Sequence, residues 1–417
     1  MKMIVVRTSV RRRLIKAAVP FMVTAAAACA VVCAVPFIEQ ISFTGRHDTA
    51  EIVNMNGNDE PVLYSPENEQ AYVTDETEAD GTDKDTSIPY NFNEEDEHEE
   101  EVTEASAFTG KYLLTQNVSE ETEDLSGFTL HSGAIYEETF GRGNGPEYIE
   151  LGNNAQLRNC TGIGNDTVAS ECSEVRDISV ELYSSEPQVL IMHTHTTESY
   201  EPYIKDWYDE RYTSRSSDPG NSVIAVGEAI SEQLAAVGIS VIHDCTIHDN
   251  VYSGAYTRSL RTTLAIMEKY PSIKIVLDIH RDAIEFSDGT RVSAVTEIDG
   301  KKAAQVMVIC AADDGTYDVP GFYNNLHFAC RLQESMEGLY PTLTRPVLFQ
   351  YCQYNQQVSP GALLIEVGSH GNSIDEAVYS GELIGKSLAA LLTETGTASE
   401  AVPVMANMPI YFLDRLK

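Results

Sequence analysis

The chain has 417 residues, with 64 acidic and 28 basic side chains and a formal net charge of -36. This balance argues against nucleic acid as a partner, because binding a phosphate backbone requires a basic surface. Apolar residues make up 42% of the chain, which excludes a wholly disordered protein and is enough for a hydrophobic core.

The N-terminal segment, residues 1–16, is basic and contains no acidic residue. An apolar run follows from Ala17 to Ile38, and as a helix it would span about 33 Å, close to the thickness of a bilayer core. Basic residues before such a run predict a cytoplasmic segment 1–16, a single-pass anchor in the cell membrane over 17–38, and an extracytoplasmic remainder. A cleaved signal peptide is the alternative, and it leaves the remainder on the same side.

Residues 39–125 have the composition of a tether. The stretch from Asp59 to Glu104 contains about 18 acidic residues and one lysine. Such a segment cannot bury enough apolar surface to offset its ordering entropy, and its like charges repel one another. The sequence therefore predicts a disordered acidic linker between the membrane and the folded part.

The folded part begins with a turn-rich lead-in over residues 126–184, which predicts short strands or an accessory subdomain. From 185 to 395, short apolar runs alternate with segments of helical periodicity. This alternation predicts one α/β domain with a mostly parallel, doubly wound sheet, followed by a tail over 396–417. The expected strands are 188–192, 239–243, 273–279, 305–311 and 362–367, and the expected helices are 221–237, 256–270, 322–339 and 373–393.

Chemically active side chains follow or interrupt three of these strands. The first strand runs into His193, His195 and Glu198, the strand 273–279 runs into His280, and the last strand contains Glu366. In open α/β sheets, ligands bind beyond the carboxyl ends of the strands. We therefore expect these side chains to converge at one edge of the sheet.

Imidazole and carboxylate groups in this combination favour a zinc site. A catalytic zinc takes three protein ligands and keeps one position for water, and a further carboxylate can pass the proton of that water to a leaving amine. His193 and His195 are two residues apart and face the same way if their segment is extended. Asp278 has the same relation to His280, and either orients it as a ligand or caps the buried strand.

Two other residues near these strand ends have competing interpretations. Arg281 is either an ion-pair partner of Asp282 or Glu366, or a group that binds a substrate carboxylate. Glu366 interrupts an apolar strand, where an unpaired carboxylate is rarely tolerated, and this indicates a functional role. A serine hydrolase is disfavoured, because neither Ser199 nor Ser369 lies in a G-x-S-x-G motif.

The eight cysteines are too few for a disulfide scaffold. Cys160 and Cys172 are candidates for one bridge within the lead-in. Four others lie in or near apolar runs and are expected to be buried thiols: Cys245, Cys310, Cys330 and Cys352.

The stretch 186–200, EPQVLIMHTHTTESY, closely resembles the signature of the stage II sporulation protein P family. Residues 278–283 (DIHRDA) and 364–368 (LIEVG) also resemble that family and follow in the right order, and 158–161 (RNCT) is similar to its upstream segment. The resemblance covers about 108–395 and the N-terminal span. The chain departs from a typical member in its long acidic tether and in Met192, where an aromatic residue is expected.

This resemblance implies a membrane-anchored peptidoglycan hydrolase, similar in fold to the zinc N-acetylmuramoyl-L-alanine amidases. Family members cut the amide between muramic acid and the stem peptide, are also described as endopeptidases, and act with stage II sporulation proteins D and M. Their role is thinning of the septal wall and engulfment during sporulation, which implies a location at the septum or the engulfing membrane.

The resemblance of these motifs also implies roles for individual residues. His193 and His280 are the expected ligands of Zn2+, and Glu366 matches the catalytic glutamate. For the third ligand, Glu198 is the first choice, Glu228 the second and His195 the third.

Two other functions stay open at this point. One is a catalytically idle, cell-wall-binding scaffold that recruits partners through the tether. The other is a zinc hydrolase of a different amide substrate.

Overall fold

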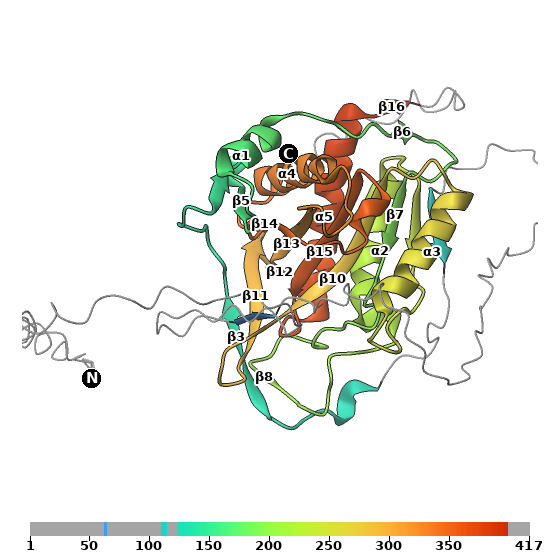
Figure 1. Ribbon diagram of the computed structural model, residues 1–417. Helices are drawn as coiled ribbons and strands as arrows, with labels where there is room; N and C mark the ends of the chain where they lie inside the picture. The colour runs from blue at the N-terminus through green and yellow to red at the C-terminus, as the bar shows by residue number, and fades with distance from the viewer. Residues whose placement is uncertain (1–61, 65–109, 115–123, 399–417) are drawn as a thin grey trace, which may run out of the picture. The chain divides into compact units, whose positions relative to one another are not determined.

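The computed structural model describes residues 62–64, 110–114 and 124–398 (Figure 1). All of them belong to one compact unit, Thr49–Lys417. The expected basic segment, the expected anchor over 17–38, most of the expected tether and the tail after residue 398 lie outside the described residues. Within the described ranges, no helix combines the length and the apolar character that crossing a membrane requires.

A mixed sheet forms the centre of the described residues, and its main path runs in the order β2-β9-β7-β10-β15-β13-β14-β5-β4. Neighbouring strands are parallel from β2 to β15 and from β13 to β5, whereas β13 is antiparallel to β15, and β4 to β5. The strands of this path are β2 (Lys111–Leu114), β4 (Tyr148–Glu150), β5 (Gln156–Asn159), β7 (Val189–Met192), β9 (Val241–Asp244), β10 (Ile275–Glu285), β13 (Val306–Ala312), β14 (Val347–Tyr351) and β15 (Gly361–Ser369).

The other strands extend the sheet from β10 or pair separately. Those attached through β10 and β11 are β1 (Val62–Tyr64), β3 (Gly133–Glu138), β8 (Trp207–Tyr208), β11 (Arg291–Ile298) and β12 (Lys301–Ala304). The separate pair is β6 (Glu181–Leu182) with β16 (Thr397–Ala398). The α-helices are α1 (Asn165–Ser173), α2 (Val223–Ala236), α3 (Ala255–Lys269), α4 (Phe322–Leu339) and α5 (Ile374–Thr395).

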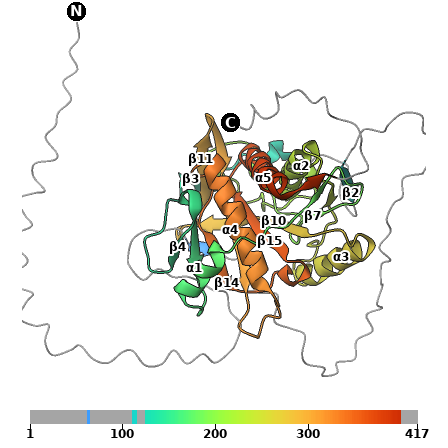
Figure 2. The ribbon, with the colours of Figure 1, turned by 90° about the horizontal axis from the view of Figure 1, so that it is seen from above.

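Alternate residues of the central strands pack against helices on opposite faces of the sheet (Figures 1 and 2). Val189 and Ile191 of β7 belong to the core that also contains residues of α2, α4 and α5. Leu190 and Met192 of the same strand belong to a second core with Ile266 of α3. Because both faces are covered, these strands read as continuous apolar runs in the sequence.

The helices lie close to where periodicity predicts them, and side-chain caps explain where two of them begin. Ser222 accepts a hydrogen bond from the backbone of Ile224 at the start of α2. Ser373 and Glu376 form a reciprocal capping box at the start of α5. Such caps satisfy backbone N–H groups that have no partner within the helix.

Two features of the sheet differ from the prediction. β10 does not end at residue 279 but continues to Glu285, so that His280, Arg281 and Asp282 are strand residues. After β10 the chain makes antiparallel pairings through β11 and β12 instead of crossing over by a helix, and β13 therefore runs antiparallel to β15. Residues 280–282 are polar, and polar residues in the sequence indicated that the strand ends there. They are buried only by tertiary contacts, which the local sequence does not show.

Segments before residue 185 also contribute to the central sheet. In the lead-in, β5 pairs with β14, and β3 pairs with β11. β2, which lies inside the range predicted as tether, pairs in parallel with β9. β1, in the same range, pairs with β10. The lead-in therefore supplies short strands to the same sheet, and so do two short segments of the range predicted as tether.

The cysteines do not form the bridge considered from the sequence. Cys160 is exposed, Cys172 is buried, and both are free thiols. The Sγ atom of Cys172 in α1 lies 2.9 Å from that of Cys330 in α4. The four cysteines expected to be buried thiols are buried and free: Cys245, Cys310, Cys330 and Cys352.

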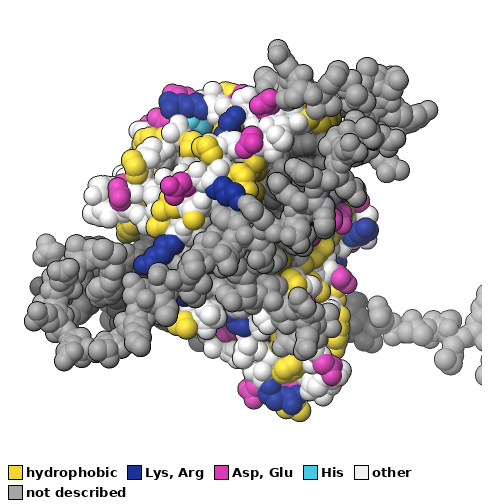
Figure 3. All heavy atoms as spheres, turned by 90° about the vertical axis from the view of Figure 1, so that its right-hand side faces the viewer, with side chains coloured by type: hydrophobic (Ala, Val, Ile, Leu, Met, Phe, Trp, Pro, Cys, Tyr) yellow, Lys and Arg dark blue, Asp and Glu magenta, His cyan; other side chains and the backbone are white. Residues whose placement is uncertain are grey.

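The described surface carries both signs of charge. On the face shown in Figure 3, acidic and basic side chains are interspersed among apolar ones. This mixture agrees with the sequence, in which a large share of the negative charge lies between Asp59 and Glu104, in residues that the structure does not describe.

Candidate metal centre

Parallel strand pairing brings His280 and Glu366 together. His280 of β10 is the register partner of Glu366 of β15, so both side chains lie on the same face of the sheet. The loop after β7 supplies His195 and Glu198. All four residues are buried, with at most 5% of any of them exposed. The sheet edge predicted from the sequence therefore does collect these side chains.

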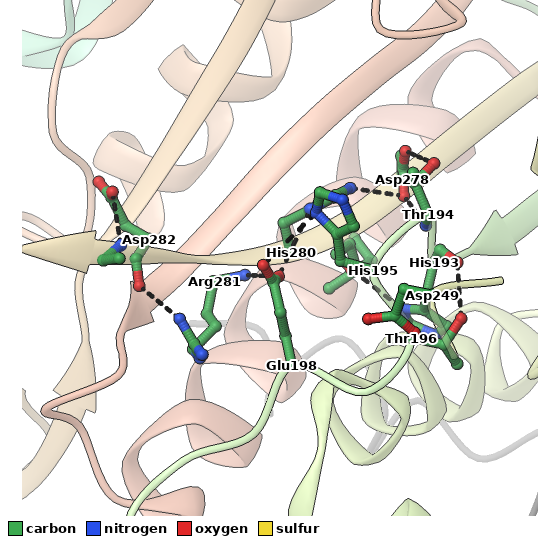
Figure 4. Close-up of polar contacts among 12 residues, drawn as sticks. His193, Thr194, His195, Thr196, Glu198, Asp249, Asp278, His280, Arg281 and Asp282 are labelled. Atoms are coloured by element: carbon green, nitrogen blue, oxygen red, sulfur yellow. Dashed lines mark hydrogen bonds and ion pairs between the residues drawn. The ribbon is translucent and has the colours of Figure 1, made fainter. Parts of the chain in front are cut away.

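His195, Glu198 and His280 form a compact group in which one ligand atom from each lies within 4.8 Å of the others. The Nδ1 atom of His195 is 3.6 Å from Glu198 Oε1, and that of His280 is 3.4 Å from Glu198 Oε2. Figure 4 shows the three side chains pointing toward one another from β10 and from the loop after β7. Two imidazoles and one carboxylate in this arrangement match the donors of a three-ligand zinc site.

The charges in the group fit a cation. Burial alone would raise the pKa of Glu198, but His195 and His280 hold that pKa well below its usual value. Burial alone would lower the pKa of His280, but Asp278 and then Glu198 raise it well above the ordinary range. The two carboxylates thus favour positive charge at His280, and a divalent cation supplies such charge in place of a proton.

Unpaired buried nitrogens also fit a metal. Neither ring nitrogen of His195 has a hydrogen-bond partner, and the same holds for Nδ1 of His280. Leaving a buried polar atom unpaired costs about 1–3 kcal/mol. A metal bound by one nitrogen of each ring removes that cost for the two nitrogens that it binds, so the residues present fit the group that the sequence predicts.

Asp278 lies behind His280, on the side away from Glu198. Its Oδ1 atom is 2.9 Å from Nε2 of His280, although at an angle that is not that of a hydrogen bond. The same carboxylate accepts hydrogen bonds from the backbone N–H and the hydroxyl of Thr194, at 2.8 and 2.7 Å. Asp278 is therefore placed to orient His280, as one sequence interpretation proposed.

Replacing Asp278 by Asn tests this role. The variant keeps the size of the side chain but removes the charge that holds His280, and we expect zinc affinity to fall by about 10- to 100-fold. Competition titration with a fluorescent zinc chelator measures the change. An affinity equal to that of the wild type would show that Asp278 only caps the strand.

Glu366 has two buried carboxylate oxygens and no hydrogen-bond partner for either of them. Burial, together with the negative charge of Asp282, raises the pKa of Glu366 to about 8. Asp282 is in turn paired with the buried Arg345, whose Nη1 donates to Asp282 Oδ2 at 2.9 Å. An unpaired carboxylate with such a pKa beside a metal group is suited to accept and return a proton near neutral pH.

The structure does not bring His193, an expected ligand, to this group. β7 alternates, so His193 falls on the face opposite to Met192 and Asp278. Its Nδ1 lies 3.0 Å from the carbonyl oxygen of Ile279, and its Nε2 lies 3.0 Å from Nε2 of His243. A turn follows His193, so the two-residue spacing does not place His193 and His195 side by side.

Glu228 also lies away from the group. Its carboxylate contacts Nδ1 of His243 at 3.2 Å and the amino group of Lys111 on β2. The hydrogen bond with His243, followed by the one with Lys111, lowers the pKa of Glu228 to about 2 although burial opposes the shift. Glu228 therefore links β2 to the histidines on the opposite face of the sheet.

This pKa predicts a pH dependence for the free energy of unfolding. Because the folded-state pKa is depressed, the Glu228 contribution is present above pH 4.5 and is lost as the pH falls toward 2. We expect Glu228→Gln to be less stable than wild type at pH 6 by no more than about 1 kcal/mol, since the carboxylate is partly exposed. Urea unfolding between pH 6 and 3 should show this difference shrinking, and a constant difference would contradict the assignment.

Arg281 has a structural role that neither sequence interpretation described fully. Its guanidinium donates to three backbone carbonyls, those of Ser199, Ser214 and Asp282, at 2.7–3.1 Å. Its backbone N–H donates to Glu198 Oε2 at 3.0 Å. Arg281 thus fixes the loop that carries Glu198, and each of its three side-chain nitrogens already donates to a backbone carbonyl.

Several residues around the group were not identified from the sequence. Asp282 and Arg345 were not recognised as a pair, because they are far apart in the chain. The loop after β9 supplies Asp249 and Tyr252, and Tyr252 stacks on His195 with ring centroids 4.7 Å apart. Arg215 lies between these residues and Glu198. No periodicity or motif marks them, since only the fold brings them to the site.

Comparison with known proteins identifies a family. The model of the family described as Stage II sporulation protein P (SpoIIP) matches residues 36–389. Among curated proteins, the chain is similar to stage II sporulation protein P of Bacillus subtilis (strain 168), with 27% identity over 200 residues. That match covers 45% of this chain and 47% of the relative, so it spans about half the length of that protein.

Solved structures with some likeness to the chain include two amidases. One is the N-acetylmuramoyl-L-alanine amidase AmiC2 of Nostoc punctiforme, with 13% identity and a TM-score of 0.30, over 51% of this chain and 97% of that one. The other is the CwlD amidase from Clostridioides difficile in complex with the GerS lipoprotein, with 11% identity and a TM-score of 0.32, over 50% and 98%.

Proposed function

The chain belongs to the stage II sporulation protein P family, and on this premise we propose that it is a zinc-dependent peptidoglycan hydrolase. The proposed reaction is cleavage of the amide that joins N-acetylmuramic acid to the L-alanine of the stem peptide. The observation that carries this proposal is the buried group of His195, Glu198 and His280 next to an unpaired Glu366.

In this proposal, His195, Glu198 and His280 hold the zinc ion. When bound, zinc supplies a Lewis acid that polarises the scissile carbonyl and makes hydroxide available near neutral pH. Asp278 orients His280, and the backbone N–H of Arg281 orients Glu198 through its hydrogen bond to Oε2. These contacts keep the two side chains in position before substrate arrives.

Glu366 serves as the general base and general acid. In its ionised form, Glu366 takes a proton from the attacking water and then delivers it to the nitrogen of the leaving peptide. Burial and the neighbouring Asp282 raise its pKa, which makes it a better proton acceptor than an ordinary glutamate. Arg345 holds the negative charge of Asp282 in place beside Glu366, and neither residue forms a hydrogen bond with the carboxylate oxygens of Glu366.

The cellular setting belongs to the same proposal. The apolar segment 17–38 would anchor the chain in the cell membrane with a cytoplasmic N-terminus, and the acidic segment would separate the extracytoplasmic hydrolase from the membrane. Membership of the family supports a role in septal wall thinning and engulfment, with stage II sporulation proteins D and M as partners. Endopeptidase activity on peptide cross-links is a second reaction that the same site would support.

The proposal is tested with full-length protein in detergent acting on purified cell-wall sacculi. We expect release of peptides with a new free L-alanine N-terminus, its loss after treatment with a chelator, and its recovery when zinc is restored. Mass spectrometry of the products identifies the bond. Products without a free L-alanine terminus, or full activity after removal of all zinc, would contradict the proposal.

A further inference from the structure

A partly exposed arginine lies beside the proposed metal ligands. Arg215 is placed opposite Glu198 by an isolated antiparallel bridge, with hydrogen bonds from Ser199 N to Ser214 O and from Ser216 N to Thr197 O. The Nη2 atom of Arg215 is 3.8 Å from Glu198 Oε1, and one third of its side chain is exposed. The bridge thus holds a cation next to the group without burying it.

The guanidinium is held in one orientation from two sides. Its Nη1 donates to Asp249 Oδ2 at 2.7 Å, and its central carbon lies 5.3 Å from the centre of the Tyr252 ring. Tyr252 stacks on His195 in turn, with 16° between the ring planes. Asp249 is buried and also accepts hydrogen bonds from the backbone N–H and the hydroxyl of Thr197. Such a guanidinium is preorganised, so it loses little entropy when it binds an anion.

The other two arginines near the site are not available in this way. Arg281 donates to backbone carbonyls and is 8% exposed, and Arg345 is paired with Asp282 and is 4% exposed. Of these three arginines, Arg215 is therefore the one whose positive charge is accessible to solvent. An anionic part of a substrate that approaches the site meets this side chain.

We propose that Arg215 binds a carboxylate of the stem peptide and sets a preference for substrates in which the second residue is a free glutamate. This inference rests on the proposed function. The second stem residue is D-glutamate or its α-amide, one residue of about 3.8 Å beyond the L-alanine at the scissile bond. Arg215 lies directly beside Glu198, a proposed zinc ligand, and can reach a group next to the scissile bond. A guanidinium binds a carboxylate through two N–H···O hydrogen bonds and opposite charge, whereas an amide offers one acceptor oxygen and no charge.

Two disaccharide tetrapeptides that differ at one group test the proposal: one carries D-glutamate as its second residue, and the other carries D-isoglutamine. For full-length, zinc-loaded wild-type protein we expect kcat/KM to be about 10- to 100-fold higher for the acid. Arg215→Gln should bring this ratio close to one, mainly through a higher KM for the acid. Arg261→Gln, which removes an exposed cation of α3, is the matched control and should keep the wild-type ratio.

The outcomes separate this inference from the function on which it rests. Cleavage of neither substrate by the wild type would overturn the proposed function itself. Equal rates for acid and amide in the wild type, or an unchanged ratio in Arg215→Gln, would overturn only the role of Arg215. Loss of bound zinc in Arg215→Gln would also overturn it, because it would show that Arg215 acts by holding Glu198.

Discussion

Replacing His195 by Ala is expected to abolish both zinc binding and hydrolysis. The side chain supplies one of the three donors of the proposed site, and neither of its ring nitrogens has another partner. Loss of the Lewis acid removes several kcal/mol of transition-state stabilisation, so activity should fall by about 10³-fold or more. Elemental analysis of the purified full-length variant, together with peptide release from sacculi, measures both effects.

His193→Ala is the matched control for this variant. His193 is two residues away and equally buried, but it contacts Ile279 and His243 on the opposite face of the sheet. Its removal takes away the contact at Nε2 of His243 and should lower stability by about 1–3 kcal/mol, whereas zinc should stay bound in stoichiometric amount. Loss of zinc in His193→Ala together with its retention in His195→Ala would reverse the ligand assignment.

Glu366→Gln is expected to bind zinc normally and to be almost inactive. The substitution keeps the size of the side chain but removes the group that accepts and returns the proton. General acid–base catalysis contributes about 10²- to 10⁴-fold, and kcat should fall within that range. Steady-state kinetics on a soluble muropeptide, with zinc content measured on the same sample, tests this expectation.

The same experiment distinguishes catalysis from structure. Glu366 is buried without hydrogen bonds, so an uncharged glutamine does not break an existing contact, and the variant should be at least as stable as the wild type. A folded, zinc-loaded Glu366→Gln with wild-type kcat would exclude Glu366 as the proton-transfer group.

Apolar patterning predicted the parts of the fold that pack on both faces of the sheet. The strand 188–192 and the helix 322–339 lie where expected, because burial and helical periodicity leave a strong signal in those stretches. The hairpin of β11 and β12 and the continuation of β10 through His280 were not predicted. Their polar residues are buried by tertiary contacts, which periodicity does not register.

The sequence predicted the edge of the sheet at which the candidate site lies, but not which side chains gather there. The strand ends and the carboxylate in β15 indicated where His280 and Glu366 meet, since parallel register follows from the fold class. The presence of His195 in the group, without His193, depends on a turn after β7 that prevents the two histidines from facing the same way. Arg215 and similar residues lie in loops that only the fold brings to the site, so the local sequence does not indicate that they lie there.

The central claim is that His195, Glu198 and His280 together bind one zinc ion. Anomalous diffraction from crystals of the zinc-loaded protein, recorded on both sides of the zinc absorption edge, tests this claim most directly. We predict one strong peak bounded by His195, Glu198 and His280, next to Glu366. A zinc peak beside His193 and His243, or no peak at any of these residues, would contradict it.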